Sequence, residues 1–312
     1  MNDQLTLFTT QQTQKTNVAL TLFSFGGGQD STAILLRMIH DPEYRKKYAP
    51  SRLLVVMSDT GSEHMRTYLH ISKIKILCRK HGIEFHFLTG DKGYHRNGWE
   101  YGLKAQYKAK NVIGMLGGLQ LCTDHLKIKP IDRFLSAWLL KNYDLKSSSR
   151  IDTCIYDFVR KHGRIRLILG FGYNEGRHKK SGKLDPVWKK KTVDRVYPLV
   201  ETKWNRKECQ EYILKLGYDL PPPSNCTICF YMSKQELVWL DRFLPEELQA
   251  WIDLEANKIK HNTHKEKNNG AGGNAKLLPQ RLKEAREEFK DWSNEQLNDY
   301  KMSHGHCVKS AY

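Results

Sequence analysis

The sequence predicts an α/β fold: a mostly parallel sheet flanked by helices, with a helical C-terminal extension. Short apolar runs typical of buried strands alternate with longer segments of helical periodicity. The strand-like runs are residues 18–23, 53–57, 84–88 and 166–172, and the helical segments are 32–39, 65–79, 131–140 and 150–162. Strands that alternate with helices in this way form parallel sheets through right-handed crossovers. The run 53–57 is apolar at every position, which fits a strand buried on both faces.

Composition divides the rest of the chain. Residues 1–17 are rich in Gln, Thr and Asn, so we expect a mobile tail before an α/β domain of residues 18–230. Residues 231–312 are expected to form the helical extension, with a flexible Lys-, Asn- and Gly-rich segment near 258–276. Residues 90–120 contain many glycines, and we expect them to form a loop on the substrate side.

The charge of the chain points to a polyanionic partner. Its 51 Lys and Arg residues exceed its 34 Asp and Glu residues, which gives a formal net charge of +17. Such an excess attracts nucleic acid, either DNA or tRNA, although a solvated basic surface explains it equally well. No apolar run approaches the roughly 18 residues of a membrane span, and the N-terminus lacks the pattern of a signal peptide. We therefore expect a cytoplasmic protein without membrane association.

A glycine-rich turn follows the first strand and precedes the first helix. Three consecutive glycines allow positive φ and let backbone N–H groups close around an anion, while the helix start adds unpaired N–H groups and a positive dipole end. Neither the dinucleotide fingerprint nor the Walker pattern fits this turn. The alternative is an ordinary turn in which Asp30 caps the helix. The segment consists of Gly26, Gly27, Gly28, Gln29, Asp30 and Ser31.

A polar segment follows the second strand. It contains Asp59, Thr60, Gly61 and Glu63, at the carboxyl end of a strand, where open α/β sheets bind ligands. Its carboxylates can hold Mg²⁺ or accept hydrogen bonds from a ribose or an adenine. The alternative is a turn and helix cap that leads into residues 65–79.

Seven cysteines form no even disulfide framework, which in a cytoplasmic chain favours metal binding or catalysis. Cys226 and Cys229 form a Cys-x-x-Cys pair in a proline-rich turn and present two thiolates to one metal ion. Two further ligands would complete a four-ligand site.

Taken in order, these segments resemble the phosphoadenylyl-sulfate reductase branch of the PP-loop ATP-pyrophosphatase superfamily. The glycine-rich turn resembles the family's Ser-Gly-Gly-x-Asp-Ser loop, with Gly26 in place of the first serine and Ser24 nearby as a substitute hydroxyl. Asp59, Thr60, Gly61 and Glu63 match its second motif. The resemblance implies a Rossmann-like (HUP-type) sheet that binds ATP, or another adenine nucleotide, with Mg²⁺.

Three further elements carry the resemblance as far as Cys229. Cys122, Thr123, Lys127 and Pro130 resemble a Cys-Thr-x-x-x-Lys-Ile-x-Pro element, which implies an anion contact for Lys127. Glu175 and Arg177 resemble the family's Glu and Arg with shortened spacing, which implies a phosphate or sulfate contact for Arg177. Residues 196–199 resemble its Tyr-Pro-Leu strand. The alternatives are a buried small residue for Cys122 and a surface charge for Lys127.

The resemblance also supplies ligands for the Cys-x-x-Cys pair. Cys122 and Cys307 join Cys226 and Cys229 in a four-thiolate set. An iron–sulfur cluster is the first interpretation, zinc is the second and a redox disulfide between Cys226 and Cys229 is the third.

Within this family we expect ATP to be cleaved to AMP and pyrophosphate, which activates a substrate for sulfur or nitrogen transfer. Asp30, Lys127 and Arg177 are the expected catalytic residues, and a sulfur-donor protein is an expected partner. One alternative is a sulfonucleotide reductase that uses Cys307, although the tail lacks the reductases' Glu-Cys-Gly-Leu-His ending. Another is a catalytically inactive nucleotide-binding or nucleic-acid-binding regulator, which Gly26 favours.

Overall fold

The computed structural model of the chain describes residues 17–115, 121–148, 150–179, 181–261, 270–271 and 276–303. The predicted tail at 1–17 and the tail around Cys307 therefore lie almost wholly or wholly outside the described residues. No helix among those residues is long and apolar enough to cross a membrane.

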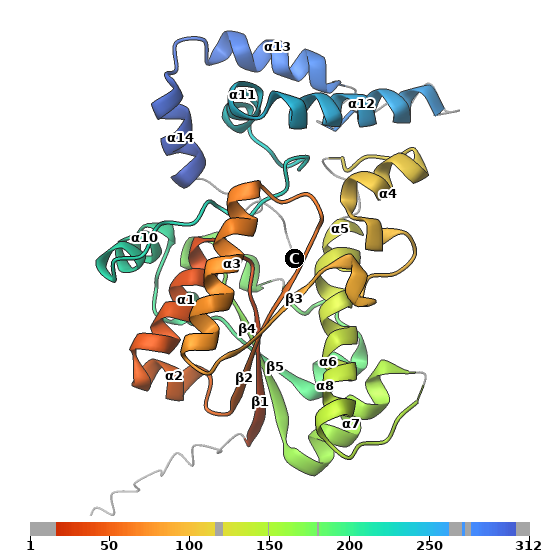
Figure 1. Ribbon diagram of the computed structural model, residues 1–312, viewed down its shortest axis with the longest axis vertical. Helices are drawn as coiled ribbons and strands as arrows, with labels where there is room; N and C mark the ends of the chain where they lie inside the picture. The colour runs from red at the N-terminus through yellow and green to blue at the C-terminus, as the bar shows by residue number, and fades with distance from the viewer. Residues whose placement is uncertain are drawn as a thin grey trace, which may run out of the picture.

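Five parallel strands form one sheet in the order β3-β2-β1-β4-β5, with β1 at its centre (Figure 1). The α/β fold with a parallel sheet is thereby confirmed. The strand-like runs at 18–23, 53–57, 84–88 and 166–172 are all present as strands, within a few residues of the predicted bounds. The strands are β1 (Val18–Ser24), β2 (Arg52–Ser58), β3 (Glu84–Leu88), β4 (Arg164–Leu169) and β5 (Val193–Val196).

Helices cover both faces of this sheet (Figure 1). One face packs against α1 (Gln29–His40), α2 (Pro42–Tyr48), α3 (Met65–Lys80) and α10 (Arg206–Lys215). The other face packs against α6 (Lys129–Asn142), α7 (Ile151–His162) and α8 (Val187–Thr192).

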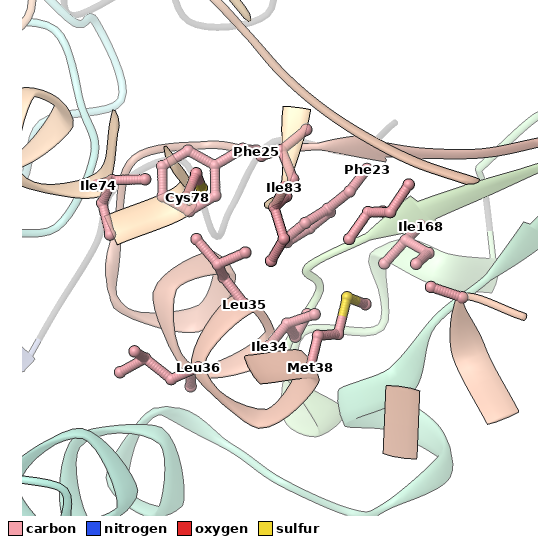
Figure 2. Packing of buried hydrophobic residues seen from close by; sticks show 14 of the residues in the cluster. Phe23, Phe25, Ile34, Leu35, Leu36, Met38, Ile74, Cys78, Ile83 and Ile168 are labelled. Atoms are coloured by element: carbon pink, nitrogen blue, oxygen red, sulfur yellow. The ribbon is translucent and has the colours of Figure 1, made fainter. Parts of the chain in front are cut away.

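Successive residues of β1 supply the two cores, because side chains alternate across a strand. Phe23 lies with α1 and α3, whereas Leu20 and Leu22 lie with α6 and α7. Figure 2 shows Phe23 and Ile168 of the sheet packed over Ile34 and Met38 of α1. Tight packing behind β1 fixes the position at which the chain leaves the sheet.

Four helices follow the sheet domain and lie beyond the carboxyl ends of the strands (Figure 1). They are α11 (Lys234–Phe243), α12 (Pro245–His261), α13 (Leu278–Glu288) and α14 (Asn294–Ser303). A third core joins α11, α12 and α13 to α4 (Leu103–Lys110), with Trp251 completely buried. A smaller core joins α11, α13 and α14.

Two predictions about local structure are wrong. Residues 90–115 do not form a plain loop: they contain α4 and the short helices η1 (Gly90–Lys92) and η2 (Trp99–Tyr101). Leu103 and Tyr107 are buried, and packing against the C-terminal helices stabilises this eight-residue helix despite the surrounding glycines. The strand predicted at 196–199 ends at Val196, and α9 (Pro198–Glu201) begins there instead. Proline at the first helical position suits a helix start because its fixed φ and missing N–H cost nothing there.

The remaining short helices lie near the carboxyl ends of the strands. They are α5 (Leu121–Thr123), the π-helical η3 (Asp124–Ile128), η4 (Tyr173–Glu175) and η5 (Arg177–Lys179).

Candidate functional site

A cavity of about 320 Å³ opens at the point where the strand order of the sheet reverses. From β1 the chain proceeds to β2 and β3 on one side, whereas β4 and β5 lie on the other side. Leu22 and Ser24 of β1 and Leu167 and Leu169 of β4 form part of the cavity wall. Open α/β sheets bind their ligands at this switch point, outside the carboxyl ends of the strands. We call this space the main cavity.

The glycine turn, residues 26–28, lies at the edge of the main cavity. Gly26, Gly28, Asp30 and Ser31 all line it. Gly28 is the N-cap of α1, and no described side chain caps this helix end. The first N–H groups of a twelve-residue helix are thus left for an anion. In this arrangement the Ser31 hydroxyl donates to the Gly28 carbonyl at 3.0 Å.

Two of the three glycines are required by the geometry of the turn. Gly27 has φ 75°, and a Cβ there would lie 3.0 Å from Met57 Cε. A Cβ on Gly28 would lie 2.9 Å from the backbone N of Ser224. At Gly26 a Cβ would meet only Ser31 Oγ, at 3.8 Å. The position where the family has serine therefore has room for that side chain.

Asp30 forms an ion pair with Arg206, whose Nη2 lies 3.3 Å from Asp30 Oδ2. Both side chains are largely buried, and Asp30 Oδ1 and Arg206 Nη1 form no hydrogen bond with any residue that the structure describes. Burial alone would lower the pKa of Arg206, but the carboxylates of Asp30 and Glu175 outweigh it and raise that pKa. The glycine turn thus lies beside a largely buried ion pair, which holds a permanent cation and a carboxylate oxygen without a hydrogen bond to any described residue.

Arg206 was missing from the predicted site. Its sequence position holds a clue, because it is a cation in the first turn of α10, where the helix dipole disfavours positive charge. A nearby carboxylate or a bound anion relieves this cost.

The polar segment after β2 is divided between two cavities. Thr60 lines the main cavity, whereas Asp59 and Gly61 line a second cavity of about 220 Å³ together with His95 and Glu100. Asp59 Oδ1 accepts hydrogen bonds from the Gly61 N–H and the Tyr68 hydroxyl, both at 2.9 Å. Burial and the adjacent Asp59 raise the pKa of Tyr68.

Glu63 lies beside Cys226, one of the predicted metal ligands. Its Oε1 accepts a hydrogen bond from the Thr60 hydroxyl at 3.1 Å and lies 3.8 Å from Cys226 Sγ. The structure thus places Thr60 in the wall of the main cavity and Glu63 beside a cysteine, whereas Asp59 lines the second cavity.

Three predicted cysteines line the main cavity. Cys122 comes from α5, and Cys226 and Cys229 come from residues 221–230, which we call the cysteine segment. An antiparallel bridge from Cys226 to Glu63 holds this segment in place. Cys226 Sγ also lies 3.3 Å from the Thr60 hydroxyl oxygen.

A buried phenol lies among these thiols. Burial raises the pKa of Tyr107, and Cys122, Cys226 and Cys229 raise it further. Tyr107 lines the main cavity together with these three cysteines. No three His, Cys, Asp or Glu side chains of the described ranges nevertheless converge on a metal-binding point. The fourth predicted ligand, Cys307, lies outside those ranges. Cys122, Cys226 and Cys229 therefore share one cavity without forming a closed ligand set.

Cations line the remaining wall of the main cavity. Lys127, the anion contact that the resemblance implies, lines it from η3. Lys189 and Arg195, absent from the predicted set, also line it. Lys189 is buried with Asp132, Nζ to Oδ1 2.6 Å, and Arg195 pairs with Asp185. Arg177 is described only by its backbone, which lies in η5.

Comparisons with known proteins add little to this site. No family model matches the chain, and no curated protein matches it. Among solved structures, the U34-tRNA thiolase NcsA from Methanococcus maripaludis with its [4Fe-4S] cluster is similar at 16% sequence identity and a TM-score of 0.36. The alignment covers 95% of this chain and 81% of that chain. These values are too low to support a functional argument.

Proposed function

We propose that this chain is a PP-loop enzyme that binds ATP and cleaves it to AMP and pyrophosphate, activating a substrate for sulfur or nitrogen transfer. One observation carries the proposal: a single cavity at the switch point is lined by the glycine turn, Lys127 and three thiols. The order of motifs along the sequence supports the same family.

The residues around the glycine turn have complementary roles in this proposal. The N–H groups of the turn and of the first turn of α1 bind phosphate oxygens. Lys127 and Arg206 supply positive charge for the phosphates, and Asp30 keeps Arg206 oriented and offers its Oδ1 to Mg²⁺. The apolar side chains of β1, β4 and α6 that line the cavity accept the adenine ring. Bound ATP supplies an electrophilic α-phosphorus to the acceptor.

In this proposal the thiols are the ligands of a metal centre that takes part in sulfur transfer. Cys122, Cys226 and Cys229, together with Cys307, would hold an iron–sulfur cluster, or zinc as the second choice. All-thiolate ligation suits both. Because Cys122, Cys226 and Cys229 do not converge on one point, binding of the cluster or of zinc would require their side chains to move towards one another.

Nucleic acid is the proposed acceptor, either tRNA or DNA. The net charge of +17 supports it. The chain between η5 and β5 lines the cavity through Ser181 and Lys189, while Lys183 and Lys190 of the same stretch are exposed. These lysines provide positive charge close to the cavity for a polyanionic substrate.

Release of AMP and pyrophosphate from ATP, measured anaerobically with and without tRNA or DNA, tests the proposal. We expect turnover that depends on nucleic acid and a sulfur donor. Sulfite release from a sulfonucleotide without ATP turnover would refute it, and ATP binding without any turnover would indicate a regulator. A visible absorption band with bound iron supports the cluster, whereas colourless protein with stoichiometric zinc supports the second choice.

The sulfonucleotide reductase remains a second candidate because of where α14 ends. The carbonyl of Met302 accepts hydrogen bonds from Gln29 and Gln210, so the last helix ends beside the glycine turn. Cys307 follows five residues later in the sequence, and five residues span at most about 18 Å. Loss of sulfite release in Cys307→Ser, with sulfonucleotide binding retained, is the result expected for a reductase.

A further inference from the structure

The side chain of Gln29 is fully engaged by protein groups. It is 2% exposed, and its Nε2 donates to the carbonyls of Pro221 and Met302, at 3.0 and 3.1 Å. Its Oε1 accepts a hydrogen bond from Gln210 Nε2 at 3.0 Å. A primary amide nitrogen carries two hydrogens, so both donors of Gln29 are used. The side chain has no donor left for a phosphate oxygen.

These bonds join α1 and α14, near opposite ends of the sequence, to α10 and the cysteine segment. Gln29 belongs to the first turn of α1, Pro221 begins the cysteine segment, Met302 is near the end of α14 and Gln210 lies in α10. Gln210 Nε2 also donates to the Met302 carbonyl at 3.1 Å. Two glutamines thus hold the end of α14 against the glycine turn.

A second set of bonds connects α14 to the cysteine segment. Lys301 forms an almost completely buried ion pair with Glu236 of α11, Nζ to Oε1 3.0 Å. Glu236 Oε1 also accepts a hydrogen bond from Asn225 at 3.3 Å, and Asn225 directly precedes Cys226. Contacts of Gln29 with Met302, of Lys301 with Glu236 and of Glu236 with Asn225 therefore connect the glycine turn to the cysteine segment through α14.

We propose that Gln29 is a positioning residue: it holds the cysteine segment and the C-terminal helix α14 against the glycine turn, and its side chain does not bind the nucleotide. Only the identity of the ligand at the turn rests on the proposed function. The Gln29 side chain, predicted from the sequence as a nucleotide contact, instead sets the distance between the phosphate-binding turn and the thiols. Its backbone N–H remains available to a phosphate.

Two variants separate positioning from direct contact. Gln29→Met and Gln210→Met each remove hydrogen bonds to the end of α14 while keeping a similar side-chain volume. Gln249→Met is the matched control, since Gln249 lies exposed on α12. Amide hydrogen exchange of residues 294–303 is measured without nucleotide, and ATP affinity and turnover are measured separately.

We expect both Gln29→Met and Gln210→Met to accelerate exchange at the end of α14 by roughly tenfold, since each variant removes one hydrogen bond to the Met302 carbonyl. Turnover should fall in both variants, with ATP affinity retained and the control unchanged. Restored turnover on supplying more ATP would contradict positioning, because it indicates a lost nucleotide contact.

The proposal is overturned if Gln29→Met weakens ATP binding about tenfold or more while exchange in α14 stays as in the parent protein. It is also overturned if neither variant changes that exchange. The exchange measurement needs no catalysis, so it decides the proposal even if the chain proves not to cleave ATP. Gln210→Met decides it in the same way if Gln29→Met does not fold.

Discussion

Each of the two carboxylate oxygens of Asp30, next to the glycine turn, can bind a partner, but only one of them binds a described residue. Its Oδ2 pairs with Arg206, while Oδ1 is buried without a hydrogen bond to any described residue. A buried carboxylate oxygen without a partner is costly, so a bound cation or ligand donor there is favoured. The residue therefore combines a structural ion pair with a ligand-facing atom.

Replacing Asp30 with Asn tests this double role. Turnover of ATP should fall about a hundredfold, because the carboxylate at the phosphates is lost. Stability should fall by about 2 kcal/mol, because Arg206 loses a charged partner in a largely buried site. Pyrophosphate release and urea unfolding measure the two effects. Asp219→Asn, at an exposed ion pair with Lys73, should change neither, and unchanged turnover in Asp30→Asn would remove Asp30 from the site.

Gly26 and Gly28 differ in what a side chain would meet. Gly26→Ser should fold with stability within about 0.5 kcal/mol of the parent and bind ATP at least as tightly, because its Cβ meets only Ser31 Oγ. Gly28→Ala should lose about 1–3 kcal/mol, because its Cβ would lie 2.9 Å from the Ser224 backbone. Thermal unfolding and ATP titration compare the pair. Gly26→Ala isolates the contribution of the hydroxyl, and a destabilised Gly26→Ser would show that the turn closes more tightly than described.

At the scale of elements, helix α14 depends on one buried ion pair. Lys301 is 4% exposed and Glu236 is 2% exposed at the side chain, so neither charge is hydrated. Lys301→Met should destabilise the protein by about 3–5 kcal/mol, because Glu236 is left as a buried charge. Denaturant unfolding measures this loss.

A double variant separates the uncompensated charge from lost packing. Adding Glu236→Gln to Lys301→Met should restore part of the stability, since no buried charge then remains. Lys290→Met, at an exposed pair with Glu287, serves as the control. Equal losses in the single and double variants would contradict an electrostatic cause.

A histidine of helix α3 that contacts α1 is expected to make the stability of the protein depend on pH. His70 Nε2 lies 2.9 Å from the Thr32 hydroxyl oxygen of α1, and burial, with a smaller effect of Lys73, lowers the pKa of His70 from 6.5 to about 4. A depressed pKa favours the neutral form in the folded state, so the unfolded chain binds more protons between these values. The resulting stability is present above pH 6.5 and is lost as the pH falls towards 4.

The free energy of unfolding measured between pH 7 and pH 4 tests this contribution. The shift from 6.5 to about 4 corresponds to a stability loss of about 3 kcal/mol. His70→Asn should flatten the curve in this window, whereas His261→Asn, at an exposed position, should leave its shape unchanged. A curve that is equally steep in His70→Asn would assign the pH dependence to other groups.

At the scale of the whole molecule, the net charge of +17 predicts electrostatic binding of nucleic acid, and the dependence of that binding on salt concentration tests it. We expect tRNA or DNA affinity to fall at least about tenfold between 50 and 200 mM salt, because bound lysines and arginines release counterions. Binding that does not respond to salt would contradict an electrostatic interface.

The location of that interface is tested by charge reversal. Lys183→Glu combined with Lys190→Glu should weaken binding and reduce the salt slope, because both lysines lie beside the main cavity wall. Lys75→Glu combined with Lys80→Glu makes the same charge change on α3, on the opposite face of the sheet. Equal effects of the two pairs would indicate a diffuse basic surface.

The elements that sequence patterns predicted well are those with long or uniform signals. The apolar strands and the helical segments 32–39 and 65–79, which lie within α1 and α3, needed only local information. Helix α4 was missed because eight residues flanked by glycine hold too few apolar positions to show a period. Its helical state depends on contacts with α12 and the cysteine segment.

For the candidate site, too, some residue positions could be predicted from sequence motifs and others could not. Gly26 and Gly28 of the glycine turn, Thr60, Lys127 and three of the four predicted cysteine ligands come from motifs, and all line the main cavity. Asp59 carries a motif too, but its side chain hydrogen-bonds to Gly61 and Tyr68 beside another cavity.

The sequence by itself determined the parts of this protein whose physics is local. Glycine's freedom at positive φ, the alternation of strand and helix and the spacing of the two cysteines are properties of neighbouring residues. Tertiary structure alone decided which distant groups meet: Arg206 with Asp30, Cys226 with Thr60 and Glu63, and Met302 with Gln29. These pairs are set by the strand order and by the packing of helices over the sheet edge, which no local pattern encodes.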